Sequence, residues 1–159
     1  MNGPRIEAAR VLTPAGWLAP GAVEVRDGRI AEVRALASAP SASSADVTLL
    51  PGFVDLQVNG IADVDAATAD PAAFARLGEL LLAQGTTTWC PTLTSAPLSA
   101  YAPWLESVQR ASGRAGGSAI AGAHLEGPFL GSLPGVHPPE HIGPPDLGWL
   151  RALPDGVAI

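Results

Sequence analysis

Strand-like and helix-like segments alternate along the chain from residue 50 onward, and this order restricts the folds that the chain can adopt. The predicted strands cover residues 50–60, 86–90, 119–126 and 157–159. The predicted helices cover residues 71–84, 97–108 and 146–153, with Asp70 as the N-cap of the first and Leu98 on the buried stripe of the second. Strands that alternate with helices in this way are parallel and are joined by right-handed crossovers. The pattern therefore predicts an α/β fold, either a barrel or a doubly wound sheet.

The turns after the predicted strands help to choose between these two architectures. None of them contains a G-x-G-x-x-G or Walker-type phosphate-binding loop. A nucleotide-binding doubly wound sheet therefore has little support, and the barrel is the preferred fold.

The first fifty residues have a different pattern and are predicted to be all β. Short strand candidates lie at residues 11–12, 22–25 and 29–33. Asp27 and Gly28 form a typical hairpin turn between the last two. Residues 37–45 consist of Ala, Ser and Pro and predict a solvated loop. We therefore expect a small N-terminal β domain segment over residues 1–50, followed over residues 51–159 by the first strands and helices of the barrel.

An imidazole and a carboxylate are predicted to meet where the strand of residues 119–126 ends. His124 and Glu126 are two residues apart, which places them on the same face of a strand. Gly127 and Pro128 then end the strand and turn the backbone away, as at the catalytic rim of a barrel. A buried ion pair or a capped loop would give the same pattern.

The strand of residues 50–60 alternates between apolar and polar side chains. One face carries Val54, Leu56 and Val58, and the other carries Asp55, Gln57 and Asn59. The apolar face could pack under helices while the polar face contributes to a site, although a sandwich strand with one face in water would look the same.

Composition excludes several classes of function. The chain has 9 Lys and Arg against 15 Asp and Glu, a formal charge of −6, so it lacks the basic footprint of a nucleic-acid-binding protein. It has no secretion signal and no apolar run of membrane-spanning length, which makes the cytoplasm the default location. Cys90 is the only cysteine and lies within a predicted strand, where a buried structural role is expected rather than a nucleophilic one.

Several motifs occur together in a characteristic order. They are PGFVD at 51–55, DLQVNG at 55–60, GTT at 85–87, PTLTS at 91–95 and HLEGPF at 124–129. With the small β domain before them, these motifs resemble the N-acetylglucosamine-6-phosphate deacetylase family of the amidohydrolase superfamily. The resemblance implies a (β/α)8 TIM-type barrel preceded by a small β-sandwich domain segment.

The resemblance also implies the site residues and the cofactor. Glu126 matches a glutamate that binds one catalytic divalent metal ion, usually zinc, and Val136 and His137 match positions that contact the sugar. Gln57 and Asn59 stand where many amidohydrolases have a metal-binding His-x-His, so a single metal is expected. Gln57 would then hydrogen-bond the reacting water or the substrate, and Asn59 would support its loop. For His137, a loop histidine packed under the following prolines is the structural alternative.

By the same resemblance, the full-length protein would deacetylate N-acetylglucosamine 6-phosphate to glucosamine 6-phosphate and acetate and would form a homodimer. A complete barrel has eight strands, so the aspartate that acts as general acid and base, two further ligands and the phosphate-binding residues are expected beyond Ile159. The 159-residue chain alone is not expected to turn over substrate. Two alternatives stay open: a deacetylase of another N-acetyl amino sugar phosphate, such as N-acetylgalactosamine 6-phosphate, and a non-catalytic truncated remnant.

Overall fold

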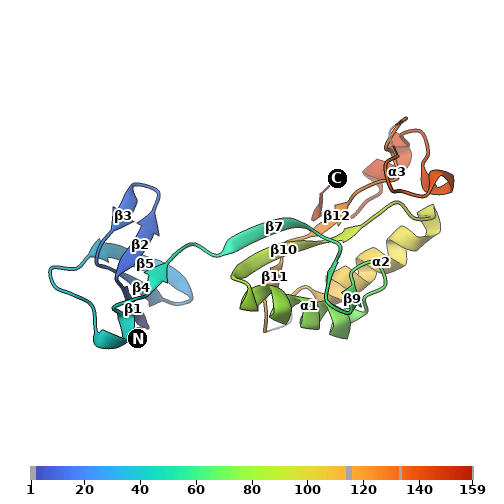
Figure 1. Ribbon diagram of the computed structural model, residues 1–159. Helices are drawn as coiled ribbons and strands as arrows, with labels where there is room; N and C mark the ends of the chain where they lie inside the picture. Colours follow the sequence, from blue (N-terminus) through green and yellow to red (C-terminus); the bar gives the residue numbers. More distant parts are fainter. Residues whose placement is uncertain (1–2, 114–115, 133, 159) are drawn as a thin grey trace. The chain divides into compact units, whose positions relative to one another are not determined.

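The computed structural model describes residues 3–113, 116–132 and 134–158, which form two compact units (Figure 1). The N-terminal unit is Met1–Pro51 and the C-terminal unit is Gly52–Ile159. Each unit has its own cluster of buried apolar side chains. Both units can therefore be described separately.

The N-terminal unit contains two small three-stranded sheets. In the first, β1 (Arg5–Ala8), β4 (Gly21–Arg26) and β5 (Arg29–Ala35) are antiparallel, in the order β1-β4-β5. In the second, β2 (Arg10–Thr13) pairs with β3 (Gly16–Leu18) and, in parallel, with β6 (Thr48–Leu49), and the short 3-10 helix η1 covers Ala42–Ser44. Ala8, Val11 and Val23 form the buried cluster of this unit. The all-β expectation holds, and β1 and β3 are strands that the sequence pattern missed.

The hairpin between β4 and β5 turns where the sequence predicts it. Asp27 has φ of 51° and Gly28 has φ of 72°, so both central residues adopt left-handed backbone conformations. Two residues with positive φ are the requirement of the type I′ hairpin turn, whose twist matches that of the flanking strands.

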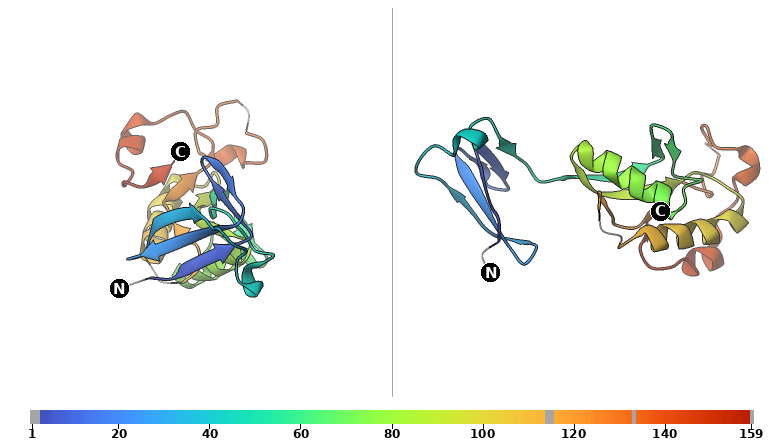
Figure 2. Two further views of the ribbon diagram at one scale, coloured as in Figure 1. Left: turned by 90° about the vertical axis from the view of Figure 1, so that its left-hand side faces the viewer. Right: turned by 90° about the horizontal axis from the view of Figure 1, so that it is seen from below.

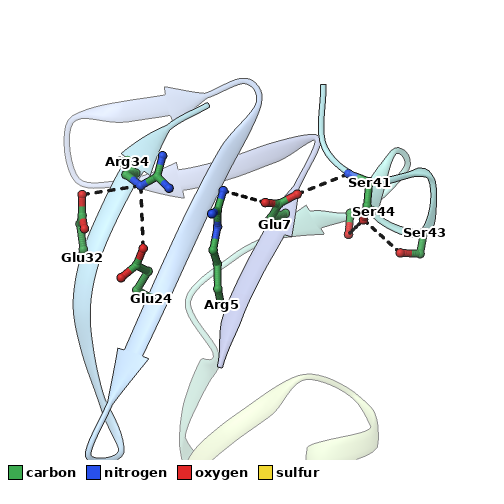
Figure 3. A network of polar contacts seen from close by, with 8 residues as sticks. All are labelled: Arg5, Glu7, Glu24, Glu32, Arg34, Ser41, Ser43 and Ser44. Carbon is green, nitrogen blue, oxygen red and sulfur yellow. Dashed lines mark hydrogen bonds and ion pairs between the residues drawn. The ribbon is translucent and has the colours of Figure 1, made fainter. Parts of the chain in front are cut away.

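Charged side chains cross-link the exposed surface of the first sheet (Figure 3). Glu24 and Glu32 are paired across β4 and β5, which would be unfavourable for two like charges. Arg34 Nε lies 4.0 Å from a carboxylate oxygen of Glu24 and 3.7 Å from one of Glu32, and so offsets this repulsion. Arg5 pairs with Glu7 at 2.7 Å. Exposed pairs of this kind contribute about 0–1 kcal/mol each.

The C-terminal unit is built on a parallel sheet. Its strands are β7 (Phe53–Val58), β10 (Thr86–Leu93), β11 (Ala119–Ile120), β12 (Ala123–Leu125) and β13 (Val157–Ala158). β10 pairs with β7 on one side and with β11 and β12 on the other, and β12 pairs with β13, all in parallel. A small hairpin of β8 (Gly60–Ile61) and β9 (Val64–Asp65) follows β7. The order of the parallel strands follows the chain, which confirms the α/β class.

Helices α1 (Pro71–Ala83) and α2 (Leu98–Ala111) cover the same face of this sheet (Figures 1 and 2). Asp70 caps α1 as expected, because its carboxylate accepts hydrogen bonds from the backbone N–H groups of Ala72 and Ala73. The short 3-10 helix η2 (Pro139–His141) and helix α3 (Leu147–Arg151) follow β12. Asp146 caps α3 through the Trp149 N–H.

Aromatic side chains fix the helices against the sheet. Phe74 on α1 packs against Trp89 on β10 with ring centroids 6.3 Å apart, and against Trp104 on α2 at 6.4 Å. Both indole N–H groups are satisfied by backbone carbonyls, Trp89 by Ser118 at 3.2 Å and Trp104 by Ala66 at 2.7 Å. Buried aromatic residues of this kind contribute large apolar areas while keeping their polar atoms bonded.

The structure corrects three details of the expected elements. β10 continues through Pro91 to Leu93, so Thr92 lies within the strand. A register shift relative to β7 between Trp89 and Pro91 lets the sheet accommodate this proline, which has no backbone N–H to donate. The single strand expected over residues 119–126 is divided into β11 and β12. Leu98, expected on the buried stripe of α2, is 50 % exposed. Ile159 of the predicted last strand lies outside the described residues.

The expected burial of the apolar face of β7 is correct at only one of three positions. Val58 is 5 % exposed and joins the core beneath the helices, whereas Val54 and Leu56 are 61 % and 66 % exposed. Within the described residues, β7 pairs only with β10. Val54 and Leu56 lie outside the core cluster that α1 and α2 form with the sheet, because these helices do not reach over them.

Candidate functional site

Glu126 lies directly beyond the carboxyl end of β12. Its backbone N–H donates to the carbonyl oxygen of Leu93 at 3.0 Å, which ties the residue to the end of the neighbouring strand β10. The side chain is 32 % exposed, so the carboxylate is partly buried but accessible to a ligand. In parallel α/β folds, ligands bind at this edge of the sheet.

Asn59 and His137 bring a second and a third polar group to this carboxylate. Asn59 follows β7, and its side-chain amide donates to Glu126 Oε2 at 3.4 Å. His137 comes from the segment between β12 and η2, and its Nε2 lies 3.6 Å from Glu126 Oε1. These three residues form what we call the Glu126 cluster. Both contacts are long, so the oxygens of Glu126 keep acceptor capacity for a further ligand.

His137 is held by polar contacts on both sides of its ring. The residue is 9 % exposed, and its Nδ1 accepts a hydrogen bond from the Ser95 N–H at 3.1 Å. Ser95 Oγ lies 2.9 Å from the same nitrogen. Ser95 is two residues beyond β10, and it ends the PTLTS motif, although no role was predicted for it from the sequence. Its place in the loop predicted to follow the strand of residues 86–90 was the available signal.

The other predicted residues are placed as follows. Gln57 is exposed near the end of β7, and its backbone N–H donates to Asp55 Oδ1 at 3.1 Å. Val136 is 97 % exposed. His124 Nδ1 lies 3.1 Å from Oγ1 of Thr92, a residue of the neighbouring strand β10. Among the described residues that the sequence singled out, Glu126 therefore contacts two others, Asn59 and His137.

Burial and charge alter the chemistry of one side chain on the central strand. Cys90 is 5 % exposed, and burial raises the pKa of its thiol, with a smaller contribution from the negative charge of Asp55. A raised pKa keeps the thiol protonated and unreactive near neutral pH. This agrees with a structural role for Cys90.

The described residues contain no group of three or more His, Cys, Asp or Glu side chains that could enclose a metal ion. Glu126 nevertheless fits one ligand position, because its carboxylate is partly buried, accessible and only weakly engaged. The other members of the cluster are less suited to bind a metal ion. The Asn59 amide is a poor ligand for zinc, and His137 makes its Nδ1 contacts with Ser95.

A cavity of about 630 Å³ lies elsewhere in the C-terminal unit, between α2 and the segment that includes α3. Tyr101, Leu105, Trp149 and Leu153 are among its lining residues, and none of the Glu126 cluster is. Its lining is mostly apolar, and Glu106 and Asp155 are the charged residues among the described lining. In the described part of the chain, no helix has the length and apolar character needed to cross a bilayer.

Comparison with known proteins points to one group of enzymes. The sequence matches no family model. It is 38 % identical over 98 residues to N-acetylglucosamine-6-phosphate deacetylase of Bos taurus, covering 59 % of this chain and 24 % of the bovine protein. It is 33 % identical over 137 residues to N-acetylgalactosamine-6-phosphate deacetylase of Escherichia coli O157:H7, covering 85 % of this chain and 36 % of that protein.

Solved structures agree with these relatives. N-acetylglucosamine-6-phosphate deacetylase of Thermotoga maritima matches 96 % of this chain and 40 % of its own, with a TM-score of 0.78 and 25 % identity. A mutant of the enzyme from Mycobacterium smegmatis, in complex with N-acetyl-D-glucosamine-6-phosphate, matches 95 % of this chain with a TM-score of 0.76 and 32 % identity. This chain is similar to N-acetylglucosamine-6-phosphate deacetylases. The resemblance inferred from the motifs is therefore confirmed, and the chain spans between about a quarter and two fifths of the length of these proteins.

Proposed function

We propose that the full-length protein is a metal-dependent hydrolase that removes the acetyl group from N-acetylglucosamine 6-phosphate. The observation that carries the proposal is the Glu126 cluster, which gathers Asn59, Glu126 and His137 at the carboxyl ends of parallel strands. The chain that forms it is similar to deacetylases of this specificity along most of its length.

In this proposal Glu126 is one ligand of a single divalent metal ion, zinc in the first instance. Such an ion, when bound, polarises the acetamide carbonyl and acidifies a water molecule. The negative charge of Glu126 offsets the charge of the ion, and Asn59 orients the carboxylate by donating to Oε2. Gln57 is proposed to hydrogen-bond the reacting water or the substrate.

The remaining residues are proposed to position the sugar. His137 presents its Nε2 beside Glu126, and Val136 offers an exposed apolar side chain next to it. Hydrolysis breaks the bond between the acetyl carbon and the sugar nitrogen, water supplies the new oxygen of acetate, and the nitrogen leaves as an amine after gaining a proton. We propose that an aspartate outside the described residues transfers that proton.

The finer architecture belongs to the same proposal. Four successive parallel strand positions, occupied by β7, β10, β11 with β12, and β13, agree with the first part of a (β/α)8 barrel. The two sheets of the N-terminal unit agree with a segment of a small β-sandwich. We also propose that the full-length protein is a homodimer and that it is located in the cytoplasm. Sedimentation of the purified full-length protein tests the first statement, and cell fractionation tests the second.

The test of the function is acetate release by the purified full-length protein with added zinc. N-acetylglucosamine 6-phosphate is the proposed substrate, and N-acetylgalactosamine 6-phosphate is the second candidate because the Escherichia coli relative named for it covers 85 % of this chain. Unphosphorylated N-acetylglucosamine serves as the control and should react more slowly. A protein that releases no acetate from either phosphorylated sugar would support the non-catalytic alternative.

A further inference from the structure

Ser95 contacts His137 with two different groups at one nitrogen. The backbone N–H of Ser95 donates to Nδ1 at 3.1 Å, and the hydroxyl oxygen lies 2.9 Å from the same atom. Both residues are buried, and 42 positions separate them in the sequence. The contact therefore links the end of β10 to the segment that follows β12.

This pair of contacts determines where the imidazole carries its hydrogen. A backbone N–H can only donate, so Nδ1 must be the acceptor and carries no hydrogen. The hydroxyl of Ser95 then donates to the same lone pair, in a three-centred arrangement. In a neutral imidazole the hydrogen is left on Nε2, which is the nitrogen that faces Glu126 Oε1 at 3.6 Å.

Gly127 makes the close approach of Ser95 possible. A Cβ atom built on Gly127 would overlap Ser95 Oγ and would also lie 3.2 Å from Ser95 Cβ. Any larger residue at position 127 would therefore displace the hydroxyl that bonds His137. Because Gly127 directly follows Glu126, this packing connects the carboxylate, the serine and the histidine.

We propose that Ser95 is a positioning residue that holds His137 in the Nε2–H tautomer, and that Gly127 provides the space this requires. The effect is to present a fixed hydrogen-bond donor to a ligand of the Glu126 cluster. The consequence for catalysis rests on the proposed deacetylase function, whereas the tautomer itself does not. Ser95 acts through His137 and is not itself expected to touch the substrate.

The first test is ¹⁵N NMR of the full-length protein labelled at histidine, with the His137 signals assigned by their loss in His137→Gln. We expect Nδ1 of His137 to show the shift of an unprotonated acceptor and Nε2 that of a protonated nitrogen. Ser95→Ala keeps the backbone N–H donor and loses only the hydroxyl, so the two shifts should move part of the way toward each other, and Ser95→Thr, which keeps the hydroxyl, should restore them. Ser107→Ala removes another buried serine hydroxyl, bonded to Ala69 O, and should leave them unchanged.

Gly127→Ala is the second variant, and it keeps the proposal testable if Ser95→Ala does not fold. It should change the His137 shifts in the same direction as Ser95→Ala. Gly143→Ala is the matched control, because Gly143 also precedes a proline but a Cβ there would meet nothing within 4 Å. In the double variant the effects should be less than additive, since removing Ser95 Oγ removes the atom that Gly127→Ala would strike.

Kinetics separate this proposal from the proposed function. Loss of one neutral hydrogen bond should raise KM for the sugar phosphate by about two- to tenfold in Ser95→Ala, with a smaller change in kcat. A His137 protonated at Nδ1 in the unsubstituted protein, or Ser95→Ala and Gly127→Ala proteins with unchanged shifts, would overturn the tautomer proposal. The expected shifts in a protein without deacetylase activity would support the tautomer proposal and contradict the function.

Discussion

Asn59 donates its side-chain amide to Glu126 Oε2 at 3.4 Å, although 67 positions separate the two residues in the sequence. The contact follows from topology, because β7 and β12 flank β10 in parallel and their carboxyl ends meet at one edge. A neutral amide can hold the carboxylate in place without competing strongly for a metal ion. The geometry therefore favours a site in which Glu126 is the ligand and Asn59 its support.

Replacing Glu126 with Gln should reduce both metal content and activity of the full-length protein. The substitution keeps the size of the side chain but removes the charge that offsets a divalent ion. Replacing even a residue that only supports a metal ligand costs about 10- to 100-fold in metal affinity. We therefore expect at least about a tenfold loss of metal affinity for this ligand, and a larger loss of kcat/KM. Metal analysis after dialysis and an acetate assay would measure these effects.

Glu140 supplies the control for this substitution. It is exposed on η2, so Glu140→Gln removes the same charge from the same part of the chain without touching the Glu126 cluster. It should keep metal and activity. A Glu126→Gln protein with full metal content and full rate would show that Glu126 is not a ligand.

The full-length protein should retain about one tightly bound metal ion per chain. By the motif resemblance, Gln57 and Asn59 stand where many amidohydrolases have the imidazoles that bind a second ion, and amide oxygens are weaker ligands for zinc. Elemental analysis after exhaustive dialysis, followed by titration of the metal-free protein with zinc, would count the ions. Two retained ions that are both needed for activity would contradict the single-metal site.

The contacts within the cluster explain how far the sequence could predict this site. Glu126 and Asn59 could be found because each lies at the end of a predicted strand, and parallel strands bring their carboxyl ends to one edge. The partner of His137 could not be found in this way. Ser95 and His137 lie in irregular segments, whose course depends on packing rather than on a repeating pattern. The close approach of Gly127 to Ser95 is likewise visible only in three dimensions.

The fold shows the same division. Capping by Asp70 and the turn at Asp27 and Gly28 are local effects of individual residues, and the sequence predicts both correctly. The continuation of β10 through Pro91 was not predicted, because it depends on a register shift relative to β7 that has no local signal. Sequence patterns thus define the elements better than their ends.

Replacing Asp70 with Ala should destabilise the protein by about 0.5–2 kcal/mol. The Asp70 carboxylate accepts from two backbone N–H groups, at 2.9 and 2.8 Å, and these would lose their partner. Denaturant unfolding would measure the change. Asp70→Asn is the control, because asparagine is an equally good N-cap residue. Equal stability of Asp70→Ala and the unsubstituted protein would show that the cap is not needed.

Cys90 should react slowly with thiol reagents in the folded protein and rapidly in denaturant. Burial, and to a smaller extent Asp55, raise the pKa of its thiol above the ordinary 9.0, so less thiolate is present at pH 8. Because the pKa of the thiol is higher in the folded than in the unfolded protein, its contribution to the free energy of unfolding is complete below the unfolded-state pKa. That contribution is lost as the pH rises through the folded-state pKa. Timed labelling followed by mass spectrometry of the Cys90 peptide would follow the reaction.

Asp55→Asn tests the electrostatic part of this effect. Removing the negative charge should lower the pKa of Cys90 modestly and speed its labelling. Asp63→Asn is the control, because Asp63 is exposed and pairs with Arg76. Equal labelling rates in the folded and denatured protein would contradict the burial of Cys90.

A protein consisting only of residues 1–159 should self-associate and should not bind zinc stoichiometrically. Phe53, Val54 and Leu56 are 58 %, 61 % and 66 % exposed on β7, a strand that pairs only with β10 among the described residues. An apolar strand with a free edge is a typical site of association. Glu126 alone would leave the other positions around a zinc ion to water, so binding should be weak.

Sedimentation velocity over a range of concentrations would test this expectation. Val54→Thr combined with Leu56→Thr places β-branched residues of high strand propensity on β7 while reducing its apolar surface, and should shift the protein toward the monomer. Val136→Thr is the control, because Val136 is 97 % exposed but lies outside the sheet, so its substitution should leave association unchanged. A monomer that unfolds cooperatively and binds one zinc ion per chain would show that these 159 residues complete both the fold and the site by themselves.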